Sequence, residues 1–221
     1  MNIRITSSLD EQEITALTGA YKQVFGESNW EEGKKCAACG KKFRLSQAPT
    51  TCCQENVTDF YADEQVRQSI QSAQENFGFQ IVRLFTQDLS GFSWGWQGSL
   101  PEINEEKLSV DYKEIAELGT RSANWFYLSE LGVSTEERGR GYGRILLRIL
   151  LATLPKNTPV ILRTSMRSEL YSLIQTEGFE TVYDYGDQDA RILSAKSLGN
   201  QKILGPQKQR RDQFLDLAYS F

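Results

Sequence analysis

The residues best placed to do chemistry form a glycine-rich turn. Glycines occupy positions 139, 141 and 143 in the run Arg138-Gly-Arg-Gly-Tyr-Gly143, between two strongly apolar segments. Closely spaced glycines let a backbone approach a ligand and aim successive N–H groups at it, and a helix that begins there adds partial positive charge. The sequence therefore predicts an anion site suited to a diphosphate. A tight surface turn is the alternative interpretation.

Two common phosphate-binding patterns do not fit this turn. A dinucleotide fingerprint needs its third glycine at position 144, which is Arg144, and should follow an early strand of a parallel βαβ unit. A P-loop needs Gly-Lys-Ser/Thr, which is also missing from the turn. Arg140 and Arg144 are candidate phosphate partners, because guanidinium groups suit phosphate oxygens. Solvated arginines at a helix end are the alternative.

The chain contains no histidine. Histidine-dependent serine or cysteine nucleophiles, histidine-ligated zinc hydrolases and histidine general bases are therefore excluded. Glu130 is the candidate base, because a carboxylate on the otherwise apolar strand 125–133 is costly to bury without a function or a partner. Regular alternation would place Glu130 on one face with Phe126 and Leu128. A strand-end glutamate paired with an arginine is the alternative.

Several segments together resemble one protein family. The pattern Arg138-x-x-Gly141-x-Gly143 is similar to the Arg/Gln-x-x-Gly-x-Gly/Ala signature of the GNAT superfamily of N-acetyltransferases, which binds the pyrophosphate of acetyl-CoA. Residues 91–96 resemble the third strand of that family, residues 127–133 its fourth strand, and Gly178-Phe179 the pair after its last helix. The resemblance implies an α+β fold with a central mixed, mostly antiparallel sheet flanked by helices. It also implies direct transfer of an acetyl group from acetyl-CoA to a primary amine of a small molecule or peptide.

The resemblance also implies a site, position by position. The pantetheine arm would lie where the strand at Leu131 and Val133 splays from residues 160–164, and the pyrophosphate would lie on Arg138, Gly139, Arg140, Gly141, Tyr142, Gly143 and Arg144. The family typically places a tyrosine, which acts as the general acid, four residues before the Gly-Phe pair. This chain has Ile174 at that position. Tyr171, one helical turn earlier on about the same face, is the candidate acid, with packing as its alternative role. Without such an acid, the thiolate would leave unassisted or take a proton from water.

Four cysteines form a second group: Cys36, Cys39, Cys52 and Cys53. Cys-x-x-Cys-Gly among lysines looks like a zinc knuckle, because the short loop aims two thiolates at one ion and nearby cations ease their deprotonation. A small insertion without its own core would gain folding energy from the metal. The neighbouring pair Cys52-Cys53 is the weak point of a four-cysteine zinc site. Disulfides and free thiols are the alternatives, and a reducing cytoplasm disfavours disulfides.

The chain around these groups reads as one domain with an insertion. Residues 1–197 should form a GNAT domain, interrupted by a zinc-binding insertion at 29–57 and followed by a tail at 198–221. The tail's Phe214, Leu217, Ala218 and Phe221 could cap the domain or pack on a second copy, so a monomer and a homodimer both remain open. Helical periodicity predicts helices at about 10–25, 62–77, 111–118, 141–154 and 168–177. Strand patterns occur at 3–5, 79–86, 91–96, 125–133, 158–164, 180–185 and 191–196.

Charge and composition limit the partners. The 221 residues include 25 Lys and Arg against 29 Asp and Glu, a formal net charge of −4, so the whole chain has no attraction for nucleic acid and none is expected as a partner. The longest apolar stretch, at 145–154, is about half of what a bilayer crossing needs. No secretory signal is recognisable, which favours the cytoplasm. The acidic segment 101–117 suggests a cationic acceptor, and a solvated loop is its alternative role.

One further function remains open. In this alternative the domain senses CoA without transferring anything, and its basic cysteine segment docks a partner or a nucleic acid. The missing tyrosine at position 174 favours the alternative, whereas the pyrophosphate turn and Glu130 favour the enzyme.

Overall fold

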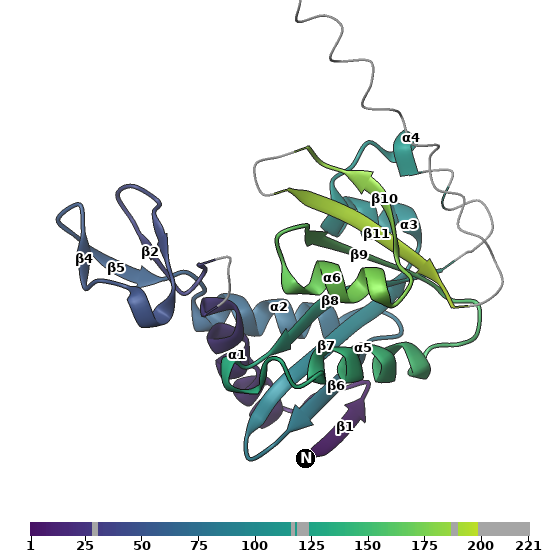
Figure 1. Cartoon of the computed structure of the whole chain (residues 1–221), viewed down its shortest axis with the longest axis horizontal. Helices are drawn as coiled ribbons and strands as arrows, with labels where there is room; N and C mark the ends of the chain where they lie inside the picture. The colour runs from purple at the N-terminus through teal and green to yellow at the C-terminus, as the bar shows by residue number, and fades with distance from the viewer. Residues whose placement is uncertain (28–30, 116–117, 119–123, 187–189, 199–221) are drawn as a thin grey trace, which may run out of the picture.

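The computed structural model describes residues 1–27, 31–115, 118, 124–186 and 190–198. Its main sheet has seven strands in the order β1-β6-β7-β8-β9-β11-β10 (Figure 1). Every neighbouring pair is antiparallel except β8 and β9, which are parallel. The expected α+β fold with a mixed, mostly antiparallel sheet is confirmed. The strands are β1 (Asn2–Thr6), β6 (Gln80–Phe85), β7 (Leu89–Gly98), β8 (Trp125–Val133), β9 (Pro159–Ser165), β10 (Glu180–Asp184) and β11 (Arg191–Ser197).

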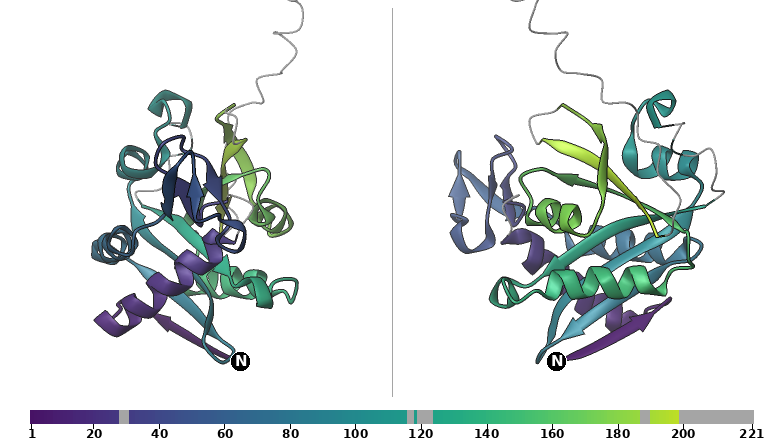
Figure 2. Two further views of the ribbon diagram at one scale, coloured as in Figure 1. Left: turned by 90° about the vertical axis from the view of Figure 1, so that its left-hand side faces the viewer. Right: turned by 45° about the vertical axis from the view of Figure 1, so that its right-hand side comes forward.

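Helices cover both faces of this sheet. Figure 2 shows α1 and α2 on one side of the strands and α5 and α6 on the other. Alternating strand residues divide the core in the same way, since Tyr127 belongs to the cluster with α1 and α2, and Phe126 to the cluster with α5 and α6. The longer helices are α1 (Glu11–Gly26), α2 (Asp63–Glu75), α5 (Tyr142–Thr153) and α6 (Glu169–Thr176), and the short turns after β7 are α3 (Leu100–Ile103), the π-turn Asn104–Leu108 and α4 (Tyr112–Ile115).

Local sequence explains where the helices near the groove begin. Asp10 and Glu13 form a capping box at the start of α1: the Asp10 carboxylate accepts from the Glu13 N–H at 2.8 Å, and Glu13 accepts from the Asp10 N–H at 3.1 Å. Ser168 caps α6 by accepting from the Tyr171 N–H at 3.3 Å. The α5 helix buries Leu146, Leu147, Leu150 and Leu151 against the sheet, so its polar N-terminal turn stays at the sheet edge.

The central strands β8 and β9 separate along their length. Their described pairing is limited to Phe126 opposite Val160 and Tyr127 opposite Ile161. Beyond these residues, the edge of β8 from 128 to 133 that faces β9 has no ladder partner among the described strands. This is the splay that the resemblance led us to expect, and it leaves room between the two strands.

A β-bulge in β8 changes which way Glu130 points. Trp94 pairs with Glu130 and Gly95 pairs with Leu128, so Ser129 is an extra residue in β8. Phe126 and Leu128 therefore face the α5 side, whereas Glu130 turns toward α1. The expectation that these three residues share one face is wrong, because it assumed unbroken alternation.

The cysteine segment forms a small sheet of its own. Its strands are β2 (Lys34–Cys36), β3 (Lys42–Phe43), β4 (Thr51–Cys52) and β5 (Glu55–Asp59), in the order β3-β2-β5-β4. These strands are too short to produce a periodic sequence signal, which is why none was expected there. We call residues 31–59 the cysteine module. In Figure 1 it projects beside the end of α1 rather than packing on a face of the main sheet.

Some expectations fall outside the described chain. The tail residues Phe214, Leu217, Ala218 and Phe221 lie there, as does part of the helix expected at 111–118, of which α4 covers residues 112–115. Within the described residues, no helix combines the length and apolar character needed to span a bilayer.

The bulge predicts an unusually intolerant glycine at position 95. A Cβ on Gly95 would lie 2.2 Å from the Tyr127 carbonyl oxygen and 2.5 Å from the Phe126 ring. Gly95→Ala should therefore lower the free energy of unfolding by roughly 2 kcal/mol or more in urea titrations. Gly19→Ala in α1 is the control, since nothing lies within 4 Å of its Cβ position. That change should instead be neutral or stabilise by about 0.5–1 kcal/mol; equal effects at both sites would contradict the bulge geometry.

Candidate active site

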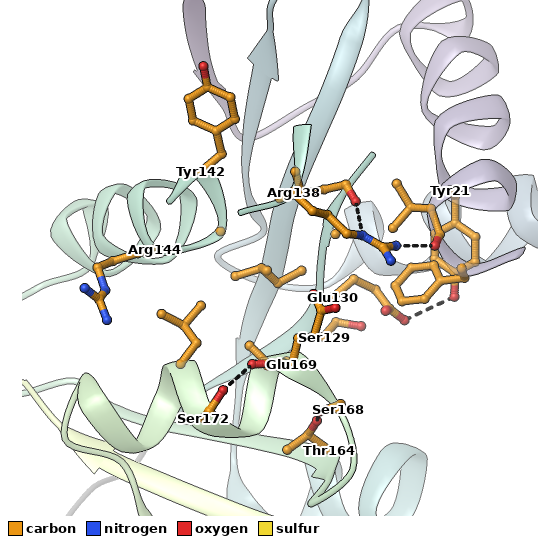
Figure 3. Close-up of a pocket in the computed structure, with 18 of the residues that line it drawn as sticks. Tyr21, Ser129, Glu130, Arg138, Tyr142, Arg144, Thr164, Ser168, Glu169 and Ser172 are labelled. Carbon is orange, nitrogen blue, oxygen red and sulfur yellow. Dashed lines mark hydrogen bonds between the residues drawn. The ribbon is translucent and has the colours of Figure 1, made fainter. Parts of the chain in front are cut away.

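A groove of about 820 Å³ runs along the splayed end of the sheet. Its walls come from β8, β9, β11, α1, α6, the first turn of α5 and the cysteine module. Figure 3 shows lining residues of α1, β8, α5 and α6. Small-molecule sites in proteins have volumes in this range. One end of the groove is the glycine-rich turn, and the other holds Glu130.

The turn leaves its amides free. Gly139 and Gly141 have φ values of 75° and 80°, a left-handed conformation that favours glycine. No described residue accepts a hydrogen bond from the N–H groups of residues 139–143, and the first backbone bond of α5 runs from the Ile145 N–H to the Gly141 carbonyl at 3.2 Å. Several unpaired donors at a helix N-terminus therefore face the groove, and this donor set fits an anionic diphosphate.

The three arginines of the turn differ in their partners. Arg138 donates to the Val133 carbonyl at 3.2 Å and to the Val24 carbonyl at 3.0 Å, so its side chain ties the turn to β8 and α1. Arg140 pairs with Glu137 at 2.9 Å, and Arg144 with Glu177 at 3.1 Å. Both arginine side chains are exposed, whereas Glu137 and Glu177 are only 15% and 8% exposed. The exposed guanidinium groups keep donors that a ligand phosphate can accept. Arg138 is thus better suited to shaping the turn than to meeting a phosphate.

The side chains of β8 form the floor between the two ends. Leu131 and Val133 belong to the cluster on the α5 side, and a Cβ at Gly143 would lie 3.6 Å from Leu131. Tyr142 lines the same end of the groove (Figure 3). All but one of the residues that the resemblance assigns to the coenzyme therefore line one groove; the exception is Arg140, which is exposed beside it.

Glu130 occupies a poorly solvated position at the other end. Burial raises the pKa of this carboxyl to about 8, although a hydrogen bond from Tyr21 acts in the opposite direction and nearby Glu32 raises it further. The Tyr21 hydroxyl donates to Glu130 Oε1 at 3.4 Å (Figure 3). A carboxyl with a pKa near 8 accepts a proton more readily than an ordinary glutamate, which suits a general base.

Three tyrosines surround this carboxyl. Tyr21, Tyr61 and Tyr127 all line the groove, and burial raises the pKa of each phenol above its ordinary value, so they remain protonated donors. The sequence patterns described above assign no role to Tyr21 or Tyr61. The available signal was that a buried tyrosine hydroxyl usually needs a polar partner.

Tyr171 lies away from the groove. The α6 residues that line it include Glu169, Ser172, Leu173 and Thr176, which share one side of the helix. Tyr171 lies on about the opposite side and packs against the core cluster of α5 and α6, next to fully buried Ile174. The geometry therefore offers no phenol from α6 to a departing thiolate.

The acidic segment also lies elsewhere. None of the described residues between 101 and 117 lines the groove, so the expectation that this segment borders the acceptor finds no support in the geometry. The carboxylates that do line it are Glu32, Glu130, Glu137 and Glu169.

The four cysteine thiols converge on one point. Their Sγ atoms all lie within 4.8 Å of one another, with 3.9 Å between Cys39 and Cys52 and 3.8 Å between Cys52 and Cys53. A tetrahedral zinc ion with Zn–S bonds of about 2.3 Å places its sulfurs about 3.8 Å apart. Cys53 has a φ of 53°, a left-handed conformation that accompanies the convergence of two neighbouring thiols. The donor set and its spacing therefore fit zinc.

A backbone contact favours the thiolate form of Cys39, whereas neighbouring thiols raise the pKa values of Cys52 and Cys53. A hydrogen bond to the Lys41 backbone is the main cause that lowers the pKa of the Cys39 thiol to about 7. The knuckle itself is closed by the Gly40 N–H, which donates to the Cys36 carbonyl at 2.9 Å. A thiol that ionises near neutral pH is a better metal ligand.

Comparison with solved structures identifies the class of fold. No family model matches the sequence, and no curated protein is similar to it in sequence. An acetyltransferase from Thermus thermophilus matches with a TM-score of 0.57 at 14% identity, over 90% of this chain and 98% of that one. NAA60 from Arabidopsis thaliana, solved with a bisubstrate analogue, matches with a TM-score of 0.54 at 13% identity, over 91% of this chain and 100% of that one.

A structure described as an acetyltransferase of the GNAT family, from Bacillus cereus, matches with a TM-score of 0.50 at 14% identity, over 89% of this chain and 98% of that one. Such low identities establish the fold alone. The chain therefore has the fold of the GNAT acetyltransferases, as the sequence resemblance predicted.

The raised pKa of Glu130 predicts a pH-dependent stability difference. The folded-state pKa of about 8 exceeds the ordinary value of 4.5, so the folded protein holds a proton that the unfolded chain releases. Wild-type stability should therefore fall between about pH 4.5 and 8 relative to Glu130→Gln, and the difference should level off above pH 8. Urea unfolding at pH 5 and pH 9 should show the variant gaining roughly 2–4 kcal/mol over wild type at the higher pH. The exposed control Glu105→Gln should show no such gain; a Glu130→Gln difference independent of pH would contradict the assignment.

Proposed function

We propose that this protein is an acetyl-CoA-dependent N-acetyltransferase that moves an acetyl group directly to a primary amine of a small molecule or peptide. One observation carries the proposal. The unpaired amides of a left-handed glycine turn lie at one end of a groove, and a carboxyl with a raised pKa, that of Glu130, lies at the other end. The GNAT fold supports it, because this arrangement lies where the central strands separate.

Acetyl-CoA, the proposed cosubstrate, supplies the acetyl thioester that an amine can attack. The amides of residues 139–143 would hold its pyrophosphate, and the exposed guanidinium groups of Arg140 and Arg144 would donate to its phosphates. Leu131, Val133 and Tyr142 would border its pantetheine arm. Arg138 would keep the turn in place through its bonds to the Val133 and Val24 carbonyls.

Glu130 would act as the base. Its carboxylate takes a proton from the acceptor ammonium, directly or through one water, and the Tyr21 hydroxyl orients that carboxylate. Tyr171 was the predicted acid, but its partly buried side chain packs against the core cluster and does not line the groove. We propose that the thiolate takes its proton from water. The ammonium loses two protons in all: Glu130 takes the first, and the nitrogen loses the second when the tetrahedral adduct collapses and the C–S bond breaks. One proton equivalent ends on the thiol of CoA and one is released to solvent, so the reaction balances.

The alternative is a domain that binds CoA without transfer. The core position of Tyr171 is the observation that favours it. A docking surface for nucleic acid on the cysteine module has less support, because Lys34 pairs with Asp59 and Lys42 with Glu32.

Acetyl transfer can be tested with the Glu130→Gln variant. Thiol release from acetyl-CoA should require an amine, and the substitution should lower kcat by about 10²- to 10⁴-fold because it removes the base. Calorimetry should give a CoA affinity within about twofold of wild type, since the phosphate end is unchanged. Glu105→Gln, exposed and outside the groove, should keep full activity. Tight CoA binding without turnover on any amine, together with retained nucleic acid, would favour the non-catalytic alternative.

We also propose that Cys36, Cys39, Cys52 and Cys53 hold one structural zinc ion. Residues 29–57 would then be a zinc-stabilised insertion within a GNAT domain at 1–197, with 198–221 as a tail. Thiolate ligands must stay reduced, which agrees with a cytoplasmic location. The oligomeric state, monomer or homodimer, stays open.

Zinc can be tested by metal analysis. Protein purified without added zinc should contain about one equivalent per chain, and Cys39→Ser with Cys52→Ser should lose it together with the protection of the cysteine module against proteolysis. The affinity for CoA should not change, because the turn at 139–143 lies in a different element. Less than about 0.2 equivalents in wild type would refute the structural zinc.

A further inference from the structure

The acceptor end of the groove has two walls of different origin. Glu130, Tyr21 and Tyr127 come from the main domain, whereas Glu32 and Lys42 come from the cysteine module. Tyr61, two residues after the module, also lines the groove, as does Arg163 of β9. A segment that looked separate in sequence thus contributes a carboxylate to the same groove as the proposed base.

Glu32 is held in place by two donors. The Lys42 ammonium lies 3.1 Å from Glu32 Oε1, and the Tyr61 hydroxyl donates to Glu32 Oε2. The Glu32 side chain is 17% exposed, whereas that of Lys42 is 43% exposed. A lysine this exposed contributes little by its ion pair. Its ammonium marks the position where a ligand ammonium could replace it at small cost.

Aromatic rings connect the two carboxylates. The rings of Tyr21 and Tyr61 meet edge to face with centroids 5.4 Å apart, and their hydroxyls bond Glu130 and Glu32 respectively. Tyrosine faces attract cations, and carboxylates at both ends of such a surface would accept one ammonium each. The arrangement fits a molecule with two separated positive charges.

The proposed metal site lies at the far end of the hairpin that carries these residues. Strands β2 and β3 pair through Lys34 with Phe43 and Lys35 with Lys42, and the Cys36-x-x-Cys39 knuckle closes their tip. Glu32 precedes β2, so it lies four residues, roughly 13 Å of extended chain, from Cys36. A metal that clamps the tip would fix the relative position of Glu32 and Lys42.

The base of the hairpin is docked tightly on α1. A Cβ at Gly33 would lie 2.5 Å from the Leu45 backbone nitrogen and 2.9 Å from the Gly26 carbonyl. Asp59 forms ion pairs with Lys22 of α1, with 2.8 Å between Nζ and Oδ2, and with Lys34 of β2, with 3.0 Å between Nζ and Oδ1. The module is therefore fixed beside α1, and its Glu32 and Lys42 form part of the groove lining.

We propose that the cysteine module is the specificity element of the acceptor site: Glu32 binds a second ammonium group and so selects diamines over monoamines. This inference rests on the proposed function for its chemistry, but the binding of the acceptor can be measured without turnover. The reacting amine lies at Glu130, and the second charge takes the place of the Lys42 ammonium at Glu32.

Calorimetry on the CoA-saturated protein tests the proposal. The ligands are α,ω-diamines with three to six carbons, each compared with the monoamine of the same length. At least one diamine should bind wild type about tenfold more tightly than its monoamine, and Glu32→Gln should reduce this ratio to below about threefold. Glu31→Gln is the matched control, since Glu31 is the exposed neighbour of Glu32 and does not line the groove. Lys42→Met should raise diamine affinity.

Metal removal is the second arm of the test. Protein treated with a chelator should lose the diamine preference as Glu32→Gln does, while its CoA affinity stays within about twofold. A wild-type protein that binds diamines and monoamines equally, or a preference that survives Glu32→Gln, would overturn the proposal. Diamine binding that depends on Glu32 without any acetyl transfer would refute the transferase and leave the acceptor site standing.

Discussion

The separation of β8 from β9 is the constraint on which the rest of the site depends. Among the described residues, β8 pairs with β9 only through Phe126 and Tyr127. The rest of the β8 edge that faces β9 is therefore unpaired. The glycine turn lies at the end of that strand, so the free amides and the open edge share one channel. Without the splay, the same turn would be an isolated anion site with no path to Glu130.

The bulge at Ser129 gives the channel its second property. It turns Glu130 away from the apolar side of α5 and toward Tyr21, where burial raises the pKa of the carboxyl and one phenol donates to it. The same change lets Leu131 and Val133 continue on the α5 side as the floor of the groove. One extra residue therefore separates the proposed proton-transfer end from the proposed coenzyme end along a single strand.

The sequence predicted the architecture better than the orientation of side chains. Regular periodicity located β8 and α5 to within one residue, because long apolar elements have strong patterns. The rotation of α6, which places Tyr171 in the core, and the bulge that redirects Glu130 depend on tertiary packing and have no local signal. The positions of Glu32 and Tyr61 could not be predicted, since nothing in the sequence shows that the cysteine module lines the same groove as Glu130.

The most direct measurement of the central claim is an amide chemical-shift titration of the protein with CoA. Our account predicts that the largest changes fall on the N–H groups of residues 139–143 and on the open edge of β8, while the amides of the cysteine module change little. Changes confined to other surfaces, or none at the glycine turn when CoA saturates the protein, would contradict it.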